Sequence, residues 1–260
     1  MEVVDNFKFV QDGTLLSRLE YPAAAMGLYL LLIWGLSTRK GNAIDTKHVD
    51  IVHNALLVVI SAVTAVGVAS GALIRSSEDG WYGLVCSARA PEAMWDGRIG
   101  YWSYVFYLTK YYELFDTIML TLKKKTLLPL HVYHHMIMPL VGWTWFAFPW
   151  LEGAWYCAFI NSLVHVAMYS YYFLATLKIR VWWKKYLTAC QIVQFISGTV
   201  FVVTFYYLKF TREEPCSGNG LSALFSVAVN LSFLALFSLF YAQNYRKPSY
   251  SRIDLTAKQK

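Results

Sequence analysis

Residues 130–139 of this 260-residue chain read LHVYHHMIMP and place three histidines, His131, His134 and His135, in an apolar stretch. The spacing i, i+3 and i+4 puts the three side chains on one face of a helix. The whole chain contains only six histidines. Half of them therefore stand together in a stretch where little water is expected, which makes this stretch a candidate functional site.

The composition around this stretch indicates a polytopic membrane protein, because 57% of the residues are hydrophobic and only 15% are charged. We predict an all-α integral membrane fold with seven transmembrane helices of roughly 20 residues each. The predicted spans are 21–37, 51–73, 99–122, 127–148, 153–177, 186–208 and 221–243. Residues 1–20 form a lumenal N-terminal segment without the pattern of a removable signal peptide, residues 21–245 the helical domain, and residues 246–260 a basic cytosolic tail.

The distribution of basic residues predicts the orientation of the chain. The loops after the first, third, fifth and seventh spans carry 15 Lys and Arg residues, counting the tail, and the opposite side carries seven. By the positive-inside rule the C-terminus is cytosolic and the N-terminus is not. Because the basic residues alternate between loops, the net charge of +7 does not form a nucleic-acid patch. Cys86 and Cys216 both fall on the non-cytosolic side, where a disulfide or two free thiols are open alternatives.

Polar side chains recur at helical spacing in three other predicted spans. They are Lys110, Glu113, Asp116 and Thr117 in KYYELFDT (110–117), Asn161, His165, Met168, Tyr169 and Tyr172 in NSLVHVAMYSYY (161–172), and Gln191 and Gln194 in TACQIVQ (188–194). At ~1.5 Å of rise per residue, the charged residues, the four histidines of these spans, the two tyrosines and the two glutamines lie roughly 9 to 20 Å below the cytosolic lysines. Ionisable groups at bilayer depth are costly and usually mark a function. Four helices thus present one polar layer, which we interpret as a site.

Histidine clusters of this kind serve either metal binding or acyl and proton transfer. A membrane di-iron desaturase needs roughly twice as many histidines as the six present here. A seven-helix membrane zinc hydrolase stays open, since three histidines and an activated water would suffice. A non-enzymatic seven-helix receptor or carrier with a buried polar ligand site is a further alternative.

The four motifs together, KYYELFDT, HVYHH, HVAMYSYY and TACQIVQ in this order, resemble the fatty acid elongase (ELO) family, with its pattern KxxExxDT, HxxHH, HxxMYxYY and TxxQxxQ. The resemblance runs from about residue 50 to 245. It implies seven helices, six of them forming a barrel around a narrow acyl tunnel, in the endoplasmic reticulum membrane. It also implies a very-long-chain 3-oxoacyl-CoA synthase, which condenses an acyl-CoA with malonyl-CoA to give 3-ketoacyl-CoA, CO₂ and CoA.

The family pattern also suggests partners and roles. It implies no metal or redox cofactor; the expected partners are the two CoA substrates, membrane lipid, and the reductases and dehydratase of the elongation cycle. His134 is the expected acyl acceptor, through an acyl-histidine intermediate. His131, His135 and His165 would position substrate or move protons, while Glu113 and Asp116 accept imidazole N–H groups. The expected substrate-binding residues are Lys110, Asn161, Met168, Tyr169, Tyr172, Gln191 and Gln194, with Lys124, Lys184 and Arg246 on a cytosolic rim for the CoA phosphates.

The sequence leaves several properties open. They are the acyl chain length and saturation, the identity of the histidine that carries the acyl group, and the oligomeric state, a homodimer included.

Overall fold

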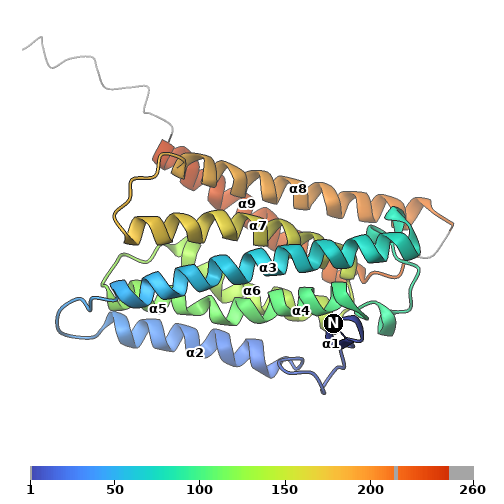
Figure 1. Cartoon of the computed structure of the whole chain (residues 1–260), viewed down its shortest axis with the longest axis horizontal. Helices are drawn as coiled ribbons and strands as arrows, with labels where there is room; N and C mark the ends of the chain where they lie inside the picture. The colour runs from blue at the N-terminus through green and yellow to red at the C-terminus, as the bar shows by residue number, and fades with distance from the viewer. Residues whose placement is uncertain (1, 214–215, 246–260) are drawn as a thin grey trace, which may run out of the picture.

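The described residues of the computed structural model, 2–213 and 216–245, form helices and no strands (Figure 1). The elements are α1 (Glu2–Asp5), α2 (Glu20–Ser37), α3 (Lys47–Asp79), the 3-10 turns η1 (Trp81–Leu84) and η2 (Pro91–Ala93), α4 (Arg98–Tyr112), α5 (Leu114–Leu122), α6 (Pro129–Ala147), α7 (Leu151–Thr176), α8 (Lys184–Thr211) and α9 (Gly220–Tyr245). The long helices run side by side along the length of the molecule (Figure 1). Helices occupy most of every predicted span, so the all-α prediction is confirmed for the described residues.

Among the residues that the structure describes, four helices, α3, α7, α8 and α9, are long and apolar enough to cross a membrane. This supports an integral membrane protein. The count of seven crossings and the closure of six helices into a barrel stay predictions. The predicted tail, residues 246–260, lies outside the described residues, and Arg246 lies with it.

The predicted span 99–122 is divided in the structure, since α4 ends at Tyr112 and α5 begins at Leu114. Glu113 between them keeps helical backbone angles, with φ −64° and ψ −18°. The amide of Asp116 donates to the carbonyl of Glu113, three residues back, which is the spacing of a 3-10 turn. Neither Gly nor Pro marks this position, so hydropathy alone predicts one continuous helix. The tight turn lies in the motif that carries both candidate carboxylates.

One end of the bundle, on the left in Figure 1, holds the turns after α2, α5 and α7. Lys124 and Lys178 adopt left-handed backbone angles there, with φ 54° and φ 63°. In each turn the next residue's amide reaches back five residues, from Lys125 to the carbonyl of Leu120 and from Ile179 to that of Leu174. These are the bonds of a Schellman helix end. They gather basic residues at the end that the charge pattern predicts to be cytosolic.

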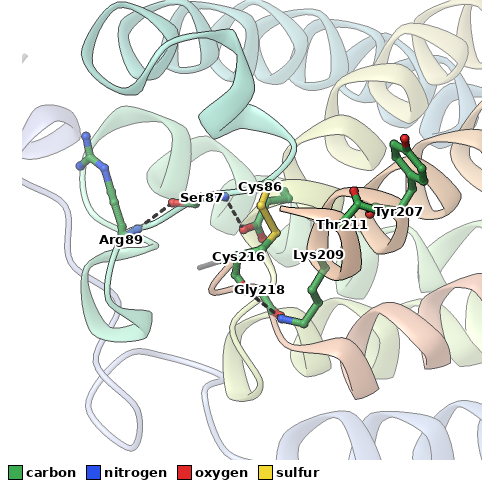
Figure 2. The surroundings of a disulfide bond; sticks show 9 residues. Cys86, Ser87, Arg89, Tyr207, Lys209, Thr211, Cys216 and Gly218 are labelled. Atoms are coloured by element: carbon green, nitrogen blue, oxygen red, sulfur yellow. Dashed lines mark hydrogen bonds between the residues drawn. A yellow bond between two sulfur atoms is a disulfide. The ribbon is translucent and has the colours of Figure 1, made fainter. Parts of the chain in front are cut away.

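The opposite end is tied by a disulfide between Cys86 and Cys216, which the sequence left open (Figure 2). The bond joins the segment after η1 to the segment after α8, across a sequence separation of 130 residues. The Lys209 side chain donates to the carbonyls of Cys216, at 2.6 Å, and Gly218, at 2.9 Å. The amide of Ser217 donates to the carbonyl of Ser87 at 2.8 Å. Two loops that are far apart in sequence are therefore fastened together.

Candidate functional site

The three histidines of the opening motif lie in the first half of α6, which Pro129 starts at a position where a missing backbone N–H has no cost. Their rings are neighbours, with centroids 4.3 Å apart for His131 and His135 and 5.3 Å apart for His134 and His135. Each nevertheless has different surroundings. His131 contacts α5, His135 faces the carboxylate of Asp116, and His134 lines a cavity.

His131 belongs to a chain of hydroxyl contacts that crosses three helices. The Thr117 Oγ1 atom lies 2.9 Å from His131 Nε2 and 2.9 Å from the hydroxyl of Tyr29 on α2. A threonine hydroxyl can donate one hydrogen bond and accept two, so both contacts can be satisfied. Tyr29, only 3% exposed, is a site neighbour that the sequence did not reveal, because a single tyrosine in an apolar span resembles ordinary packing.

A buried ion pair between Lys110 and Glu113 contacts two residues of α7. Lys110 Nζ lies 2.7 Å from Glu113 Oε1 and 3.3 Å from Asn161 Oδ1, and it also lies 4.2 Å above the ring of Phe106. The same Glu113 oxygen lies 3.3 Å from His165 Nδ1. Lys110 and Glu113 are each only 2% exposed, so each charge compensates the other. The predicted residues of two motifs thus meet, and Glu113 lies against both Lys110 and the His165 ring.

Asp116 is the other carboxylate of the site, and it contacts three helices. Its Oδ1 atom lies 2.6 Å from His53 Nε2 on α3. Its Oδ2 atom accepts the Tyr169 hydroxyl at 2.8 Å and lies 3.8 Å from His135 Nε2. His53 is the second neighbour that the sequence analysis missed, since it stands outside the four motifs.

Of the other predicted substrate-binding residues, some contact one another or line a cavity, and others are exposed. Gln191 Nε2 contacts Met168 Sδ at 3.8 Å, and Gln194 lines the same cavity as His134 and Asn161. Tyr172 is 41% exposed and packs its ring 6.0 Å from that of Tyr169. Lys124 and Lys184 are exposed, and neither contributes to the cavity wall.

The cavity has a volume of about 60 Å³ and lies between α4, α6, α7, α8 and α9. His134, Asn161 and Gln194 supply polar atoms to its wall. Much of the remaining wall is apolar and includes Phe106, Met138, Val141, Trp145, Phe195 and Phe233. This volume holds no more than a few water molecules. A tunnel long enough for an acyl chain therefore stays a prediction.

This arrangement is suited to acyl transfer. An imidazole is a good nucleophile toward a thioester, and His134 presents one to a largely apolar space. Apolar walls keep out water that would hydrolyse a reactive acyl group. Within residues 2–213 and 216–245, no three His, Cys, Asp or Glu side chains are grouped to hold a metal ion.

The comparisons with known proteins point to one family. The chain matches the GNS1/SUR4 family, ELO, over residues 14–252. It is 39% identical to fatty acid elongase sre1 of Dictyostelium discoideum over 248 residues, which cover 94% of this chain and 90% of the relative. It is 33% identical to fatty acid elongase A of the same organism, covering 95% and 90%, and 32% identical to very long chain fatty acid elongase 2 of Mus musculus, covering 84% and 74%. The match spans nearly the whole chain and all four motifs, so the chain belongs to the ELO family.

Proposed function

We propose that this chain is the condensing enzyme of fatty acid elongation, a very-long-chain 3-oxoacyl-CoA synthase. Family membership and relatives named as fatty acid elongases support a role in elongation. The observation that carries the specific reaction is the position of His134, whose imidazole lines the cavity beside Asn161. Glu113 and Asp116 contact the neighbouring histidines, His165 and His135.

In the first step His134 attacks the thioester carbonyl of an acyl-CoA. A bond forms between the imidazole nitrogen and the acyl carbon, the carbon–sulfur bond breaks, and the imidazole proton passes to the CoA thiolate. The acyl-imidazole that results is itself a good acyl donor. The apolar wall of the cavity would protect it from hydrolysis.

In the second step malonyl-CoA loses CO₂, and the resulting enolate attacks the acyl carbonyl. The carbon–nitrogen bond breaks, the imidazole takes up one proton, and 3-ketoacyl-CoA is released. The His165 ring held by Glu113 and the His135 ring beside Asp116 would stabilise the enolate or supply this proton. The two steps balance without transfer of electrons to another molecule, so we propose no redox cofactor.

CoA would reach the site from the cytosolic end of a multi-pass protein in the endoplasmic reticulum membrane, with the N-terminus in the lumen. Lys124 lies just after α5, and Lys184 is the first residue of α8. Both are exposed, and their charges would attract the CoA phosphates. Lys123 is less available, because it pairs with Asp50 at 2.8 Å. The product would pass to the reductases and the dehydratase of the elongation cycle.

A condensation assay tests the proposal. Purified full-length protein receives labelled malonyl-CoA and a panel of acyl-CoAs, without NADPH, and labelled 3-ketoacyl-CoA is measured. We expect product with at least one acyl chain, and a loss of more than 100-fold in the His134→Ala variant. His48→Ala, an exposed histidine of α3, should keep the wild-type rate. Absence of product with every chain, from protein that melts cooperatively, would exclude a condensing enzyme.

A further inference from the structure

His53 is a buried histidine that none of the proposed steps uses. It lies near the start of α3, outside the four motifs, and only 4% of it is exposed. Both of its ring nitrogens have partners. Nδ1 lies 3.1 Å from the hydroxyl of Tyr112, and Nε2 lies 2.6 Å from Asp116 Oδ1.

The chemistry of these partners fixes the direction of each hydrogen bond. An ionised carboxylate only accepts, so the Nε2 atom that faces Asp116 must carry a proton. In a neutral imidazole Nδ1 is then an acceptor, and the Tyr112 hydroxyl donates to it. His53 thus serves as a donor to Asp116 in one defined tautomer, which we assign from this bonding pattern.

Packing holds the His53 ring in place. Its centroid lies 5.1 Å from that of Tyr112, 5.3 Å from that of Phe115 and 6.5 Å from that of Tyr169. A side chain enclosed in this way has few alternative rotamers. The carboxylate that it contacts is therefore restrained as well.

The restraint on Asp116 matters because its other carboxylate oxygen, Oδ2, faces Tyr169 and His135. Asp116 Oδ2 accepts the Tyr169 hydroxyl at 2.8 Å and lies 3.8 Å from His135 Nε2. With His53 on one oxygen and Tyr169 on the other, the carboxylate plane is fixed. Without His53, the half-buried Oδ1 atom would lose its closest partner, and the carboxylate could turn toward other hydrogen-bond donors.

We propose that His53 is a positioning residue for the condensation reaction, which holds the Asp116 carboxylate in the orientation that faces His135. The proposal rests on the proposed function. His53 does not line the cavity, so its loss should affect turnover more than substrate binding. Misplacement of a catalytic group by about 1 Å can slow an enzyme about 100-fold.

Two variants of His53 separate positioning from packing. His53→Leu fills much of the space without a donor, whereas the carboxamide of His53→Gln can donate to Asp116 from near the position of Nε2. The matched control is His48→Leu, because His48 is exposed on the same helix, about one and a half turns away. Thermal unfolding of each variant in detergent reports whether the protein remains folded.

We expect His53→Leu to lower kcat at least tenfold while KM changes less than twofold. His53→Gln should recover at least half of the wild-type kcat, and His48→Leu should match the wild type. In thermal unfolding, the loss in Tm for the His53→Leu and Asp116→Asn double variant should be smaller than the sum of the two single losses, because both remove one contact.

A His53→Leu variant with wild-type kcat would overturn the positioning role and leave the proposed function intact. An equal loss of kcat in the Leu and Gln variants would show that His53 acts through packing alone, and it would also overturn the positioning role. A wild-type protein that forms no 3-ketoacyl-CoA would overturn the proposed function and this role together.

Discussion

The Thr117 hydroxyl contacts polar side chains from two other helices of the site. It links His131 on α6 to Tyr29 on α2, with both contacts at 2.9 Å, and it is fully buried. Three side chains from three helices depend on one oxygen atom. Loss of that atom would leave the buried Tyr29 hydroxyl and the half-buried His131 imidazole without this partner.

Replacement of Thr117 by the isosteric valine should therefore destabilise the protein. A buried polar group that loses its partner costs about 1–3 kcal/mol, and the half-buried His131 costs less than the buried Tyr29, so we expect the free energy of unfolding to fall by about 2 kcal/mol. The measurement is thermal unfolding in detergent. The control is Thr204→Val, because the Thr204 hydroxyl is exposed and bonds to the carbonyl of Val200 in its own helix. Equal melting temperatures for the two variants would show that the Thr117 contacts contribute nothing.

The sequence predicts site residues well where they stand in motifs and poorly elsewhere. Charged and imidazole groups at helical spacing predicted that Lys110, Glu113 and His165 lie at one depth, and the structure brings these three into contact, together with Asn161 on the same face of α7 as His165. Tyr29 and His53 lie on largely apolar helices. Whether such side chains reach the site depends on how their helix is rotated against its neighbours, which spacing alone does not specify.

Close contact between α3 and α4 depends on small residues in α3. A Cβ atom at Gly71 would lie 2.5 Å from the backbone nitrogen of Ile99 and 2.6 Å from its Cα atom. At Gly67 a Cβ would overlap the ring of Trp102. Backbone atoms cannot move aside as a side chain can, so Gly71 sets the distance between the helices.

We expect Gly71→Ala to destabilise the protein by about 1–3 kcal/mol, the usual cost of overpacking. Gly27→Ala on α2 is the control, because nothing lies within 4 Å of its Cβ position. This change should be neutral or should stabilise the helix by about 0.5–1 kcal/mol. Thermal unfolding of both variants provides the comparison, and a Gly71→Ala variant as stable as Gly27→Ala would show that α3 and α4 do not pack this closely.

The predicted spans identify each long helix but not its ends. The range 51–73 lies inside α3, which runs from Lys47 to Asp79. The additional turns carry polar residues such as Asp50 and Arg75, and hydropathy is sensitive only to the apolar middle of a helix. Hydropathy also does not detect the turn at Glu113, because the hydrogen-bond spacing changes there while the apolar character of the segment does not.

The molecule as a whole has two different ends. One holds the basic turns after α5 and α7, and the other holds the disulfide between Cys86 and Cys216 (Figures 1 and 2). The sequence predicted that the basic loops and the two cysteines lie at opposite ends, because both signals depend on which side of a membrane a loop faces, and it left the bond between the cysteines open. Whether six helices close into a barrel depends on side-by-side packing that hydropathy does not encode.

The disulfide should contribute strongly to stability, because it closes a long loop. A separation of 130 residues corresponds to roughly 5 kcal/mol by chain entropy, an upper value for bonds of this kind. We expect the Cys86→Ala and Cys216→Ala double variant to lose about 3–5 kcal/mol. Reductant should lower the melting temperature of the wild type but not that of this variant. The exposed Cys190→Ala is the control, and a wild type that is insensitive to reductant after complete reduction would contradict the expectation.

The measurement to make first is the intact mass of the protein after incubation with one acyl-CoA and no malonyl-CoA. We expect a mass increase of one acyl group, located on His134 by peptide mapping and absent in His134→Ala. Addition of malonyl-CoA should remove the acyl group and release it as 3-ketoacyl-CoA. Condensation by the wild type without any acylated protein, or with the acyl group on another residue, would show that His134 is not the acyl acceptor.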